Sequence, residues 1–277
     1  MKHLLLILIT SLITSSFTAK RVTWTALGDS ITYLNEHPKE TRNRITKGYM
    51  TRVVEKLPQI SYINKGYNGW TASRVAGEIN NLGIMSSDVY TIFLGTNDWW
   101  SEVPLGTWND YVENTGNGTF YGSYKIIVNK LHNLNKSAKI VLITPMQRGD
   151  FIYIADKKNN AWGSYKLKNG QSLAAFAEAI GIIGKHEKMR VVDLYNHSGI
   201  TLDNVVKFKR VKDESTAQYV NLTYPEYIEK PFNPYTDEYP YPPEAVEMTY
   251  DGLHPSDQGY EIIAGMLVQV FKKIKLN

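Results

Sequence analysis

The stretch "YDGLHPSDQGY" at residues 250–260 holds the pair of side chains best suited to chemistry in this chain. Asp251 precedes His254 by three positions, in a turn framed by glycine and proline. A histidine beside a carboxylate can act as a general base, because the carboxylate orients the imidazole and stabilises its protonated form. The same residues also fit the start of a helix, since Pro255 and the Ser256 oxygen are favoured in a first turn. Both interpretations stay open until a nucleophile is found elsewhere.

Serine is the nucleophile that such a base would serve, and cysteine is excluded because the chain contains none. Of the six histidines, His254 alone stands near a carboxylate in a glycine-framed turn. Three other segments combine glycine with small polar residues where an apolar run ends. They are "GDS" (28–30), "NKGYNG" (64–69) and "GTND" (95–98). Each alone is typical of an ordinary turn, but binding groups in an open parallel sheet collect at the carboxyl ends of its strands.

These segments and the Asp251–His254 pair resemble the SGNH (GDSL) hydrolases, a family of serine esterases and lipases. The four residues after which that family is named match Ser30, Gly69, Asn97 and His254, in the same chain order. Asp251 matches the aspartate that the family carries three positions before its histidine. The motifs lie at the beginning, middle and end of the chain, so the resemblance covers the whole domain. It implies a serine hydrolase that works through an acyl-enzyme.

The resemblance also assigns a role to each matching residue. Ser30 is the nucleophile, His254 is its base, and Asp251 fixes and stabilises the imidazole. The oxyanion hole consists of the backbone N–H groups of Ser30 and Gly69 and the side-chain amide of Asn97. Glycine suits its place there, because a backbone can approach a substrate closely only where no Cβ intrudes.

Two aspartates beside these residues, Asp29 and Asp98, raise the alternative of a metal site. Neither belongs to a set of histidines and carboxylates at metal-ligand spacing. Attack by a serine hydroxyl needs no metal, and a carboxylate directly before a helix commonly caps its free N–H groups. We therefore expect Asp29 to cap the element after the first strand, and we expect no metal and no other cofactor.

Five apolar runs rich in Val, Ile, Tyr and Thr indicate strands that are covered on both faces. The runs occupy residues 21–30, 60–69, 88–98, 138–146 and 189–195. Stretches with apolar residues at helical spacing alternate with them. These stretches occupy residues 48–57, 72–82, 121–134, 172–188 and 256–275. The alternation predicts an α/β fold with a parallel sheet between helices, and the resemblance implies a flavodoxin-like three-layer α/β/α sandwich around a mostly parallel five-stranded sheet.

The chain has 277 residues, 43% of them hydrophobic, which is enough to bury a sizeable core. Residues 1–19 are expected to be a cleaved signal peptide, because Lys2 and His3 precede an apolar stretch too short to span a bilayer. An uncleaved anchor is the alternative. Residues 20–277 are then a single domain, secreted or periplasmic, without disulfides and without stable membrane insertion. A Tyr- and Pro-rich insertion at about 197–249 interrupts its alternating pattern.

Aromatic residues near the motifs bear on the substrate. Trp70, Trp99 and Trp100 are candidates for substrate binding, with packing beneath the turns as the alternative. Loops of this composition favour a polar, glycan-like partner, so the expected activity is deacetylation of a glycan. The alternatives are a lysophospholipase or thioesterase for longer acyl chains, and an inactive glycan-binding module. A net charge of +4 without a long basic run argues against a nucleic-acid partner. Residues 224–249 lead into the Asp251–His254 turn and are expected to form one wall of the cleft.

Overall fold

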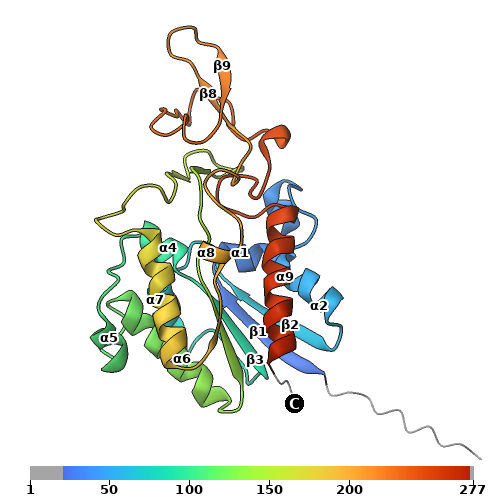
Figure 1. Cartoon of the computed structure of the whole chain (residues 1–277), viewed down its shortest axis with the longest axis vertical. Coiled ribbons are helices and arrows are strands. Elements are labelled where there is room, and N and C mark those ends of the chain that lie inside the picture. Colours follow the sequence, from blue (N-terminus) through green and yellow to red (C-terminus); the bar gives the residue numbers. More distant parts are fainter. Residues whose placement is uncertain (1–20, 275–277) are drawn as a thin grey trace, which may run out of the picture.

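The computed structural model of the protein describes residues 21–274, so the predicted signal peptide at 1–19 lies outside the described residues. Five parallel strands form the central sheet, in the order β2-β1-β3-β4-β7 (Figure 1). The strands are β1 (Val22–Gly28), β2 (Ile60–Gly66), β3 (Val89–Phe93), β4 (Lys139–Ile143) and β7 (Arg190–Val192). Each strand lies within one of the five predicted runs, so the predicted five-stranded parallel sheet is confirmed.

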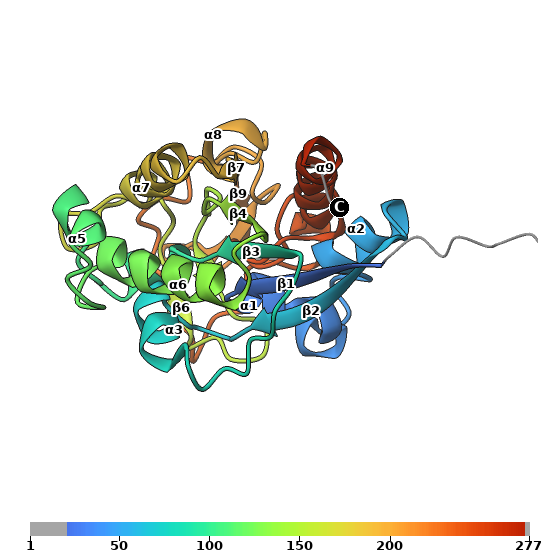
Figure 2. The ribbon, with the colours of Figure 1, turned by 90° about the horizontal axis from the view of Figure 1, so that it is seen from below.

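Helices cover both faces of the sheet and complete a three-layer sandwich (Figure 2). The apolar core of one face includes α2 (Tyr49–Lys56) and α9 (Asp257–Lys273). The core of the other face includes α3 (Ala72–Glu78), α6 (Phe120–Leu134) and α7 (Leu173–His186). In β4, Val141 and Ile143 belong to the first core, and Ile140 and Leu142 belong to the second, because successive side chains of a strand point to opposite faces. None of the helices within residues 21–274 is both long and apolar enough to cross a membrane.

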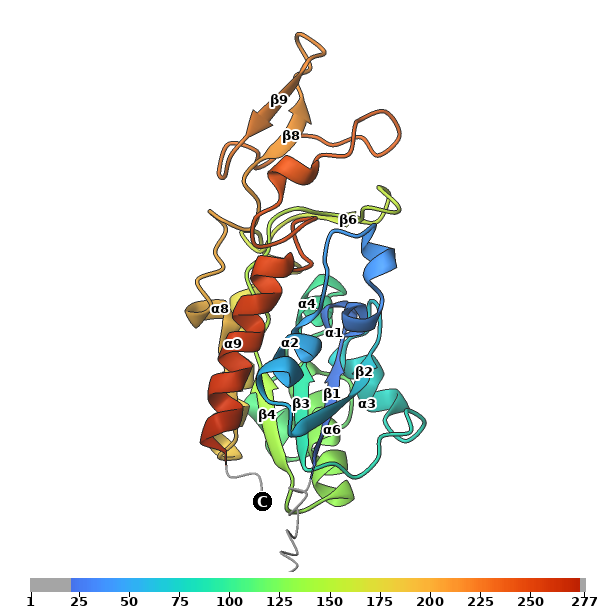
Figure 3. The ribbon, with the colours of Figure 1, turned by 90° about the vertical axis from the view of Figure 1, so that its right-hand side faces the viewer.

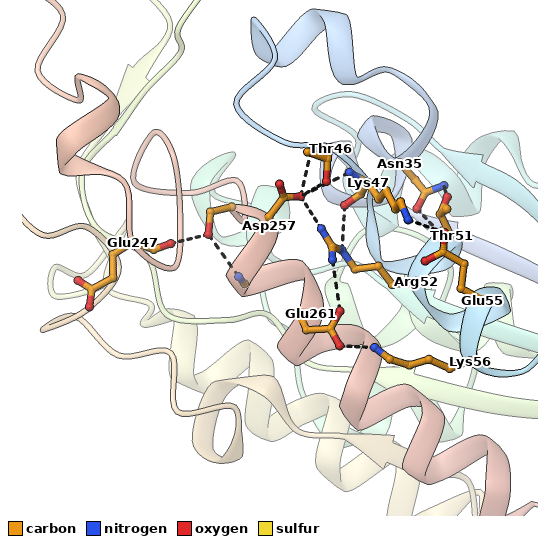
Figure 4. Close-up of polar contacts among 12 residues, drawn as sticks. Asn35, Thr46, Lys47, Thr51, Arg52, Glu55, Lys56, Glu247, Asp257 and Glu261 are labelled. Carbon is orange, nitrogen blue, oxygen red and sulfur yellow. Dashed lines mark hydrogen bonds and ion pairs between the residues drawn. The ribbon is translucent and has the colours of Figure 1, made fainter.

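A polar network fastens the start of α9 to α2 (Figure 4). The Arg52 guanidinium forms ion pairs with Asp257 and, at 3.3 Å, with Glu261, which also pairs with Lys56. Asp257 further accepts hydrogen bonds from the backbone and hydroxyl of Thr46, both at 2.9 Å. Exposed ion pairs stabilise a protein by only about 0–1 kcal/mol each. The network therefore contributes modestly to the packing of α9 on α2.

The connections between these elements carry short elements of their own. They are α1 (Ser30–Tyr33), η1 (Leu34–Glu36), η2 (Pro38–Thr41), α4 (Thr96–Trp100), α5 (Trp108–Val112), β5 (Phe151–Ile152), β6 (Asn160–Ala161) and α8 (Leu194–His197). Residues 99–119, between β3 and α6, are partly helical, because α4 extends into them and α5 lies within them.

The insertion at 197–249 contains an antiparallel hairpin and one turn of 3-10 helix. These elements are β8 (Lys209–Lys212), β9 (Tyr219–Leu222) and η3 (Pro243–Ala245). The hairpin projects beyond the carboxyl ends of the central strands (Figure 3). Tyr227 and Tyr241 of the insertion are fully buried, so the segment packs against the rest of the domain.

Candidate active site

Ser30 is the first residue of α1. It follows Asp29, which caps α1 directly after the end of β1. Asp29 Oδ1 accepts a hydrogen bond from the Ile31 N–H at 3.0 Å, which confirms the predicted cap. At Gly28, an added Cβ would come within 2.1 Å of the Thr32 hydroxyl oxygen in α1. The glycine therefore lets α1 lie close against the end of β1, and this packing fixes the position of the serine.

The turn that carries His254 is held together by the Asp251 carboxylate. Oδ1 of Asp251 accepts hydrogen bonds from the backbone N–H groups of Leu253 and His254 at 3.1 and 2.7 Å. Oδ2 lies 2.7 Å from His254 Nδ1. Gly252 has a φ of 88°, and a Cβ there would lie 1.9 Å from the carbonyl oxygen of Asp150. The turn thus requires glycine between the carboxylate and the imidazole.

The fold brings Ser30 beside this turn. Ser30 Oγ lies 2.9 Å from His254 Nε2, although 224 positions separate the two residues. When Nδ1–H donates to Asp251, Nε2 presents its lone pair to the serine hydroxyl, as general-base activation of a serine requires. The imidazole is held between Tyr250, stacked at 5.8 Å between ring centres, and Phe151, edge-on at 5.3 Å. Base and hydroxyl are therefore in hydrogen-bond contact without any rearrangement.

Asp29 places a second carboxyl group near the imidazole. Desolvation of this buried side chain raises the pKa of Asp29 to about 6, while the hydrogen bond from Ile31 and the charge of His254 act in the opposite direction. The charge of an ionised Asp29 attracts an imidazolium at this position, because opposite charges attract. The imidazolium is the form that appears once the serine proton has moved to His254.

The three predicted oxyanion donors gather around the same cavity, which Ser30, Gly69 and Asn97 all line. The Asn97 side chain donates one N–H to the carbonyl oxygen of Trp70 at 3.0 Å, which leaves its second N–H for another acceptor. Gly69 has a φ of 72°, and an added Cβ would meet nothing within 4 Å. Its left-handed backbone is a further reason for glycine at this position.

Asp98 joins the two turns that carry Gly69 and Asn97. Both of its carboxylate oxygens lie 2.9 Å from the Ala72 N–H at the start of α3. Burial raises the pKa of Asp98 to about 7, and the hydrogen bonds from Ala72 and Ser73 partly oppose this shift. Sequence reasoning missed this positioning role, although the place of Asp98 directly after Asn97 was a signal. Within residues 21–274, no three histidine or carboxylate side chains gather closely enough to hold a metal ion.

The three tryptophans predicted to bind substrate lie in different environments in the structure. Trp100 lines the cavity. Trp99 is fully buried in the core, and its indole N–H donates to the Gln171 carbonyl at 2.9 Å, so its prediction as a cleft residue is wrong. Consecutive residues of α4 point about 100° apart, so one faces the core and the other the cavity. Trp70 stacks on Tyr67 at 4.4 Å and does not line the cavity.

The cavity has a volume of about 300 Å³. Part of its lining comes from residues 148–161, the segment after β4, which sequence reasoning did not assign to the site. The lining residues of this segment are Arg148, Phe151, Tyr153, Asn159 and Ala161. Their position directly after the fourth strand was the available signal, because loops at that end of a parallel sheet surround the binding crevice.

Residues 224–249 support this segment from behind, and the prediction that they form a wall of the cleft is wrong. None of them is among the residues that line the cavity. Tyr241 donates its hydroxyl to the Asp150 carbonyl at 2.5 Å, and Tyr239 donates to the Ile152 carbonyl at 3.1 Å. The short strands β5 and β6 pair over two residues only, so their backbone needs hydrogen-bond partners outside the ladder.

The parallel α/β fold thus brings a serine, a histidine and an aspartate into hydrogen-bond contact beside a cavity, and this is the geometry that a serine hydrolase requires. The family model of the GDSL-like Lipase/Acylhydrolase family matches residues 26–262. The chain belongs to this family, and it is a carboxylic ester hydrolase.

Solved structures agree with this assignment. A structure described as "a possible lipase from Chitinophaga pinensis" is 57% identical, with a TM-score of 0.91 over 92% of this chain and 100% of that chain. An acetyl xylan esterase is 19% identical, with a TM-score of 0.51 over 90% and 99% of the two chains. A mutant acetyl-xylooligosaccharide esterase from Geobacillus is 18% identical, with a TM-score of 0.51 over 90% and 93%. The last two show the fold alone. No curated protein matches this chain.

Proposed function

We propose that the protein deacetylates a glycan outside the cytoplasm, and that Ser30, His254 and Asp251 carry the reaction. The observation that carries the proposal is the hydrogen-bonded series from the Ser30 hydroxyl through the imidazole to the buried carboxylate. His254 takes the proton as Ser30 Oγ attacks the ester carbonyl, and returns it to the departing alcohol. Water then hydrolyses the acyl-enzyme by the same route and releases the acid.

The oxyanion that forms in each step needs donors already in place. We assign this task to the N–H groups of Ser30 and Gly69 and to the free amide N–H of Asn97. Loss of one such donor typically lowers turnover about 10²–10³-fold. Asp98 enters the mechanism indirectly, because it fixes the start of α3 against α4.

The preference for a small acyl group on a glycan rests on the cavity. Its volume of about 300 Å³ is at the lower end of the ~300–1,000 Å³ of ligand pockets. Asn68, Asn159 and Glu40 line it beside Trp100 and Tyr153, and aromatic faces with polar neighbours suit sugar rings. Two neighbours of the same fold are named as esterases of acetylated xylan and xylo-oligosaccharide. Export follows from the signal peptide expected at residues 1–19.

Acetate release from acetylated polysaccharides, beside a chain-length series of nitrophenyl esters, tests this function. We expect activity to be highest on acetyl esters and to disappear in Ser30→Ala with unchanged circular dichroism and Tm. An optimum at octanoyl or longer chains would replace deacetylation with lipase or thioesterase action. Unchanged turnover in Ser30→Ala would remove the nucleophile from the proposal.

A further inference from the structure

Arg148 lines the same cavity as Ser30 and His254, and it is only 1% exposed. Arginine is rarely so buried unless a carboxylate or another anion pairs with it. The mechanism described above makes no use of this residue.

The protein offers the buried guanidinium of Arg148 few hydrogen-bond acceptors. Nη2 donates to the Trp162 carbonyl at 2.9 Å, whereas Nε is buried without an acceptor. The guanidinium carbon lies 5.2 Å from the ring centres of Trp99 and of Trp100. These ring faces attract a cation but do not satisfy its N–H groups.

The carboxylates near Arg148 are already engaged by other groups. Asp150 Oδ2 pairs with Lys209 Nζ at 2.6 Å, and its Oδ1 accepts from Gly163 and Tyr165. Asp251 is held by His254 and by its own turn. Both carboxylates attract the guanidinium from a distance, yet no ion pair of Arg148 occurs within residues 21–274.

Other charged side chains near the cavity also have partners of their own. Glu40 accepts the Tyr33 hydroxyl at 2.8 Å. Lys168 lies over the Trp100 ring at 4.5 Å but pairs with Glu102 at 3.0 Å. Burial lowers the pKa of Arg148 to about 10, so the guanidinium keeps its positive charge at neutral pH.

From this arrangement we propose that Arg148 makes the site selective for ester substrates that carry a carboxylate, such as an acidic glycan. This inference rests on the proposed function, and it narrows the substrate class from esters of glycans in general to esters of glycans that carry a negative charge. A substrate carboxylate in the cavity would give the guanidinium the anionic partner that the described residues do not provide, and the planar fork of arginine matches carboxylate geometry. The enclosed position strengthens that pairing, because water competes little for either charge.

The wild-type enzyme gives the first test through two matched pairs of esters. 4-Acetoxybenzoate and 4-acetoxybenzamide place the carboxylate or its neutral counterpart on the alcohol side. Ethyl hydrogen succinate and ethyl succinamate place them on the acyl side. We expect kcat/KM to favour the carboxylate of one pair by about 10- to 100-fold, the range for a hydrogen bond to a charged group, mainly through KM. Equal kcat/KM within both pairs would overturn the proposal.

Arg148→Gln removes the charge, and Arg148→Lys keeps it without the fork. We expect Arg148→Gln to abolish the difference in kcat/KM between the carboxylate ester and its neutral counterpart, and Arg148→Lys to retain part of this difference. Arg210→Gln is the matched control, because the Arg210 guanidinium also lies over an aromatic ring, Tyr219 at 5.5 Å, but outside the cavity. A carboxylate preference that survives in Arg148→Gln would refute the role of this residue.

A binding measurement separates failure of this proposal from failure of the proposed function. Calorimetric titration of the wild type, Arg148→Gln and Arg148→Lys with benzoate and benzamide needs no turnover. Benzoate binding that requires Arg148, in a protein without esterase activity, would preserve the anion site and reject the deacetylase. Esterase activity without selective benzoate binding or a carboxylate preference would do the reverse. If Arg148→Gln does not fold, the wild-type ester pairs and benzoate titration still decide the proposal.

Discussion

Replacement of Asp251 by asparagine tests how the turn governs the imidazole. In the wild type, Asp251 Oδ1 accepts the N–H groups of Leu253 and His254, and Oδ2 faces His254 Nδ1 at 2.7 Å. Asparagine has one oxygen for these two tasks. If that oxygen stays with the backbone, the NH₂ group faces Nδ1, which must then become the acceptor. The proton moves to Nε2, and the imidazole can no longer accept the proton of Ser30.

The expected loss of kcat follows from the free energy needed to rotate the new side-chain amide of Asp251→Asn by 180°. Turning the asparagine oxygen toward Nδ1 restores the active tautomer but leaves the backbone N–H groups of Leu253 and His254 buried without acceptors. Each unsatisfied group costs about 1–3 kcal/mol, so both together cost about 4 kcal/mol. The active arrangement would then fall to about one molecule in 10³. We expect Asp251→Asn to lower kcat by about 10³–10⁴-fold.

The assay is kcat for 4-nitrophenyl acetate at pH 8, with the free energy of unfolding measured in urea. Asp257→Asn is the matched control, because Asp257 also accepts backbone hydrogen bonds next to this turn but lies outside the cavity. It should retain kcat within about twofold and lose about 1 kcal/mol of stability at most. A loss of kcat below about tenfold in a folded Asp251→Asn would refute the tautomer argument.

Three further predictions concern stability. Gly252→Ala should lower the free energy of unfolding by about 2 kcal/mol or more in urea, because its φ is 88° and its Cβ would strike the Asp150 carbonyl. Lys209→Met should cost about 3–5 kcal/mol in the same assay, since it leaves the Asp150 carboxylate buried without its cation. Asp98 has a folded pKa of about 7 against 3.8, so the folded state holds a proton that the unfolded state releases. Stability should fall by up to about 4 kcal/mol as pH rises from about 4 to 7, and Asp98→Asn should flatten this slope in urea titrations at each pH. A free energy of unfolding equal to that of the wild type would contradict the prediction for Gly252→Ala or for Lys209→Met. An unchanged dependence of stability on pH in Asp98→Asn would contradict the third prediction.

The central sheet was predictable because its signals are local and redundant. The inner strands β1 and β3 are buried on both faces and are apolar along most of their length, so they are plain in the sequence. The glycines at strand ends mark turns, and parallel topology carries those turns to one edge. That reasoning placed the segments of Ser30, Gly69 and Asn97 at one edge of the sheet, and the resemblance to the SGNH hydrolases added His254 to them.

Other features depend on contacts that a linear pattern does not encode. Trp99 and Trp100 are identical in type and adjacent in sequence, yet α4 turns one into the core and the other toward the cavity. Of this pair, the prediction of a cleft residue is wrong for Trp99 alone, because the sequence did not indicate a helix at residues 96–100. Arg148 follows β4 in a stretch without helical or strand periodicity, so its burial beside the indoles depends on how the loop folds back.

The insertion at 197–249 shows how a segment can influence specificity without touching the substrate. The sequence predicts that residues 224–249 form a wall of the cleft, because they lead into the turn of Asp251 and His254. In the structure, Tyr239 and Tyr241 donate to carbonyls of the 150–154 backbone, and Lys209 neutralises Asp150. These three contacts hold the segment that presents Phe151 and Tyr153 to the cavity. Because β5 and β6 offer so little pairing of their own, the geometry of this side of the site depends on residues more than 50 positions away in sequence. Substitution of Tyr239, Tyr241 or Lys209 can therefore alter the shape of the cavity through residues 150–154, although none of these three side chains lines it.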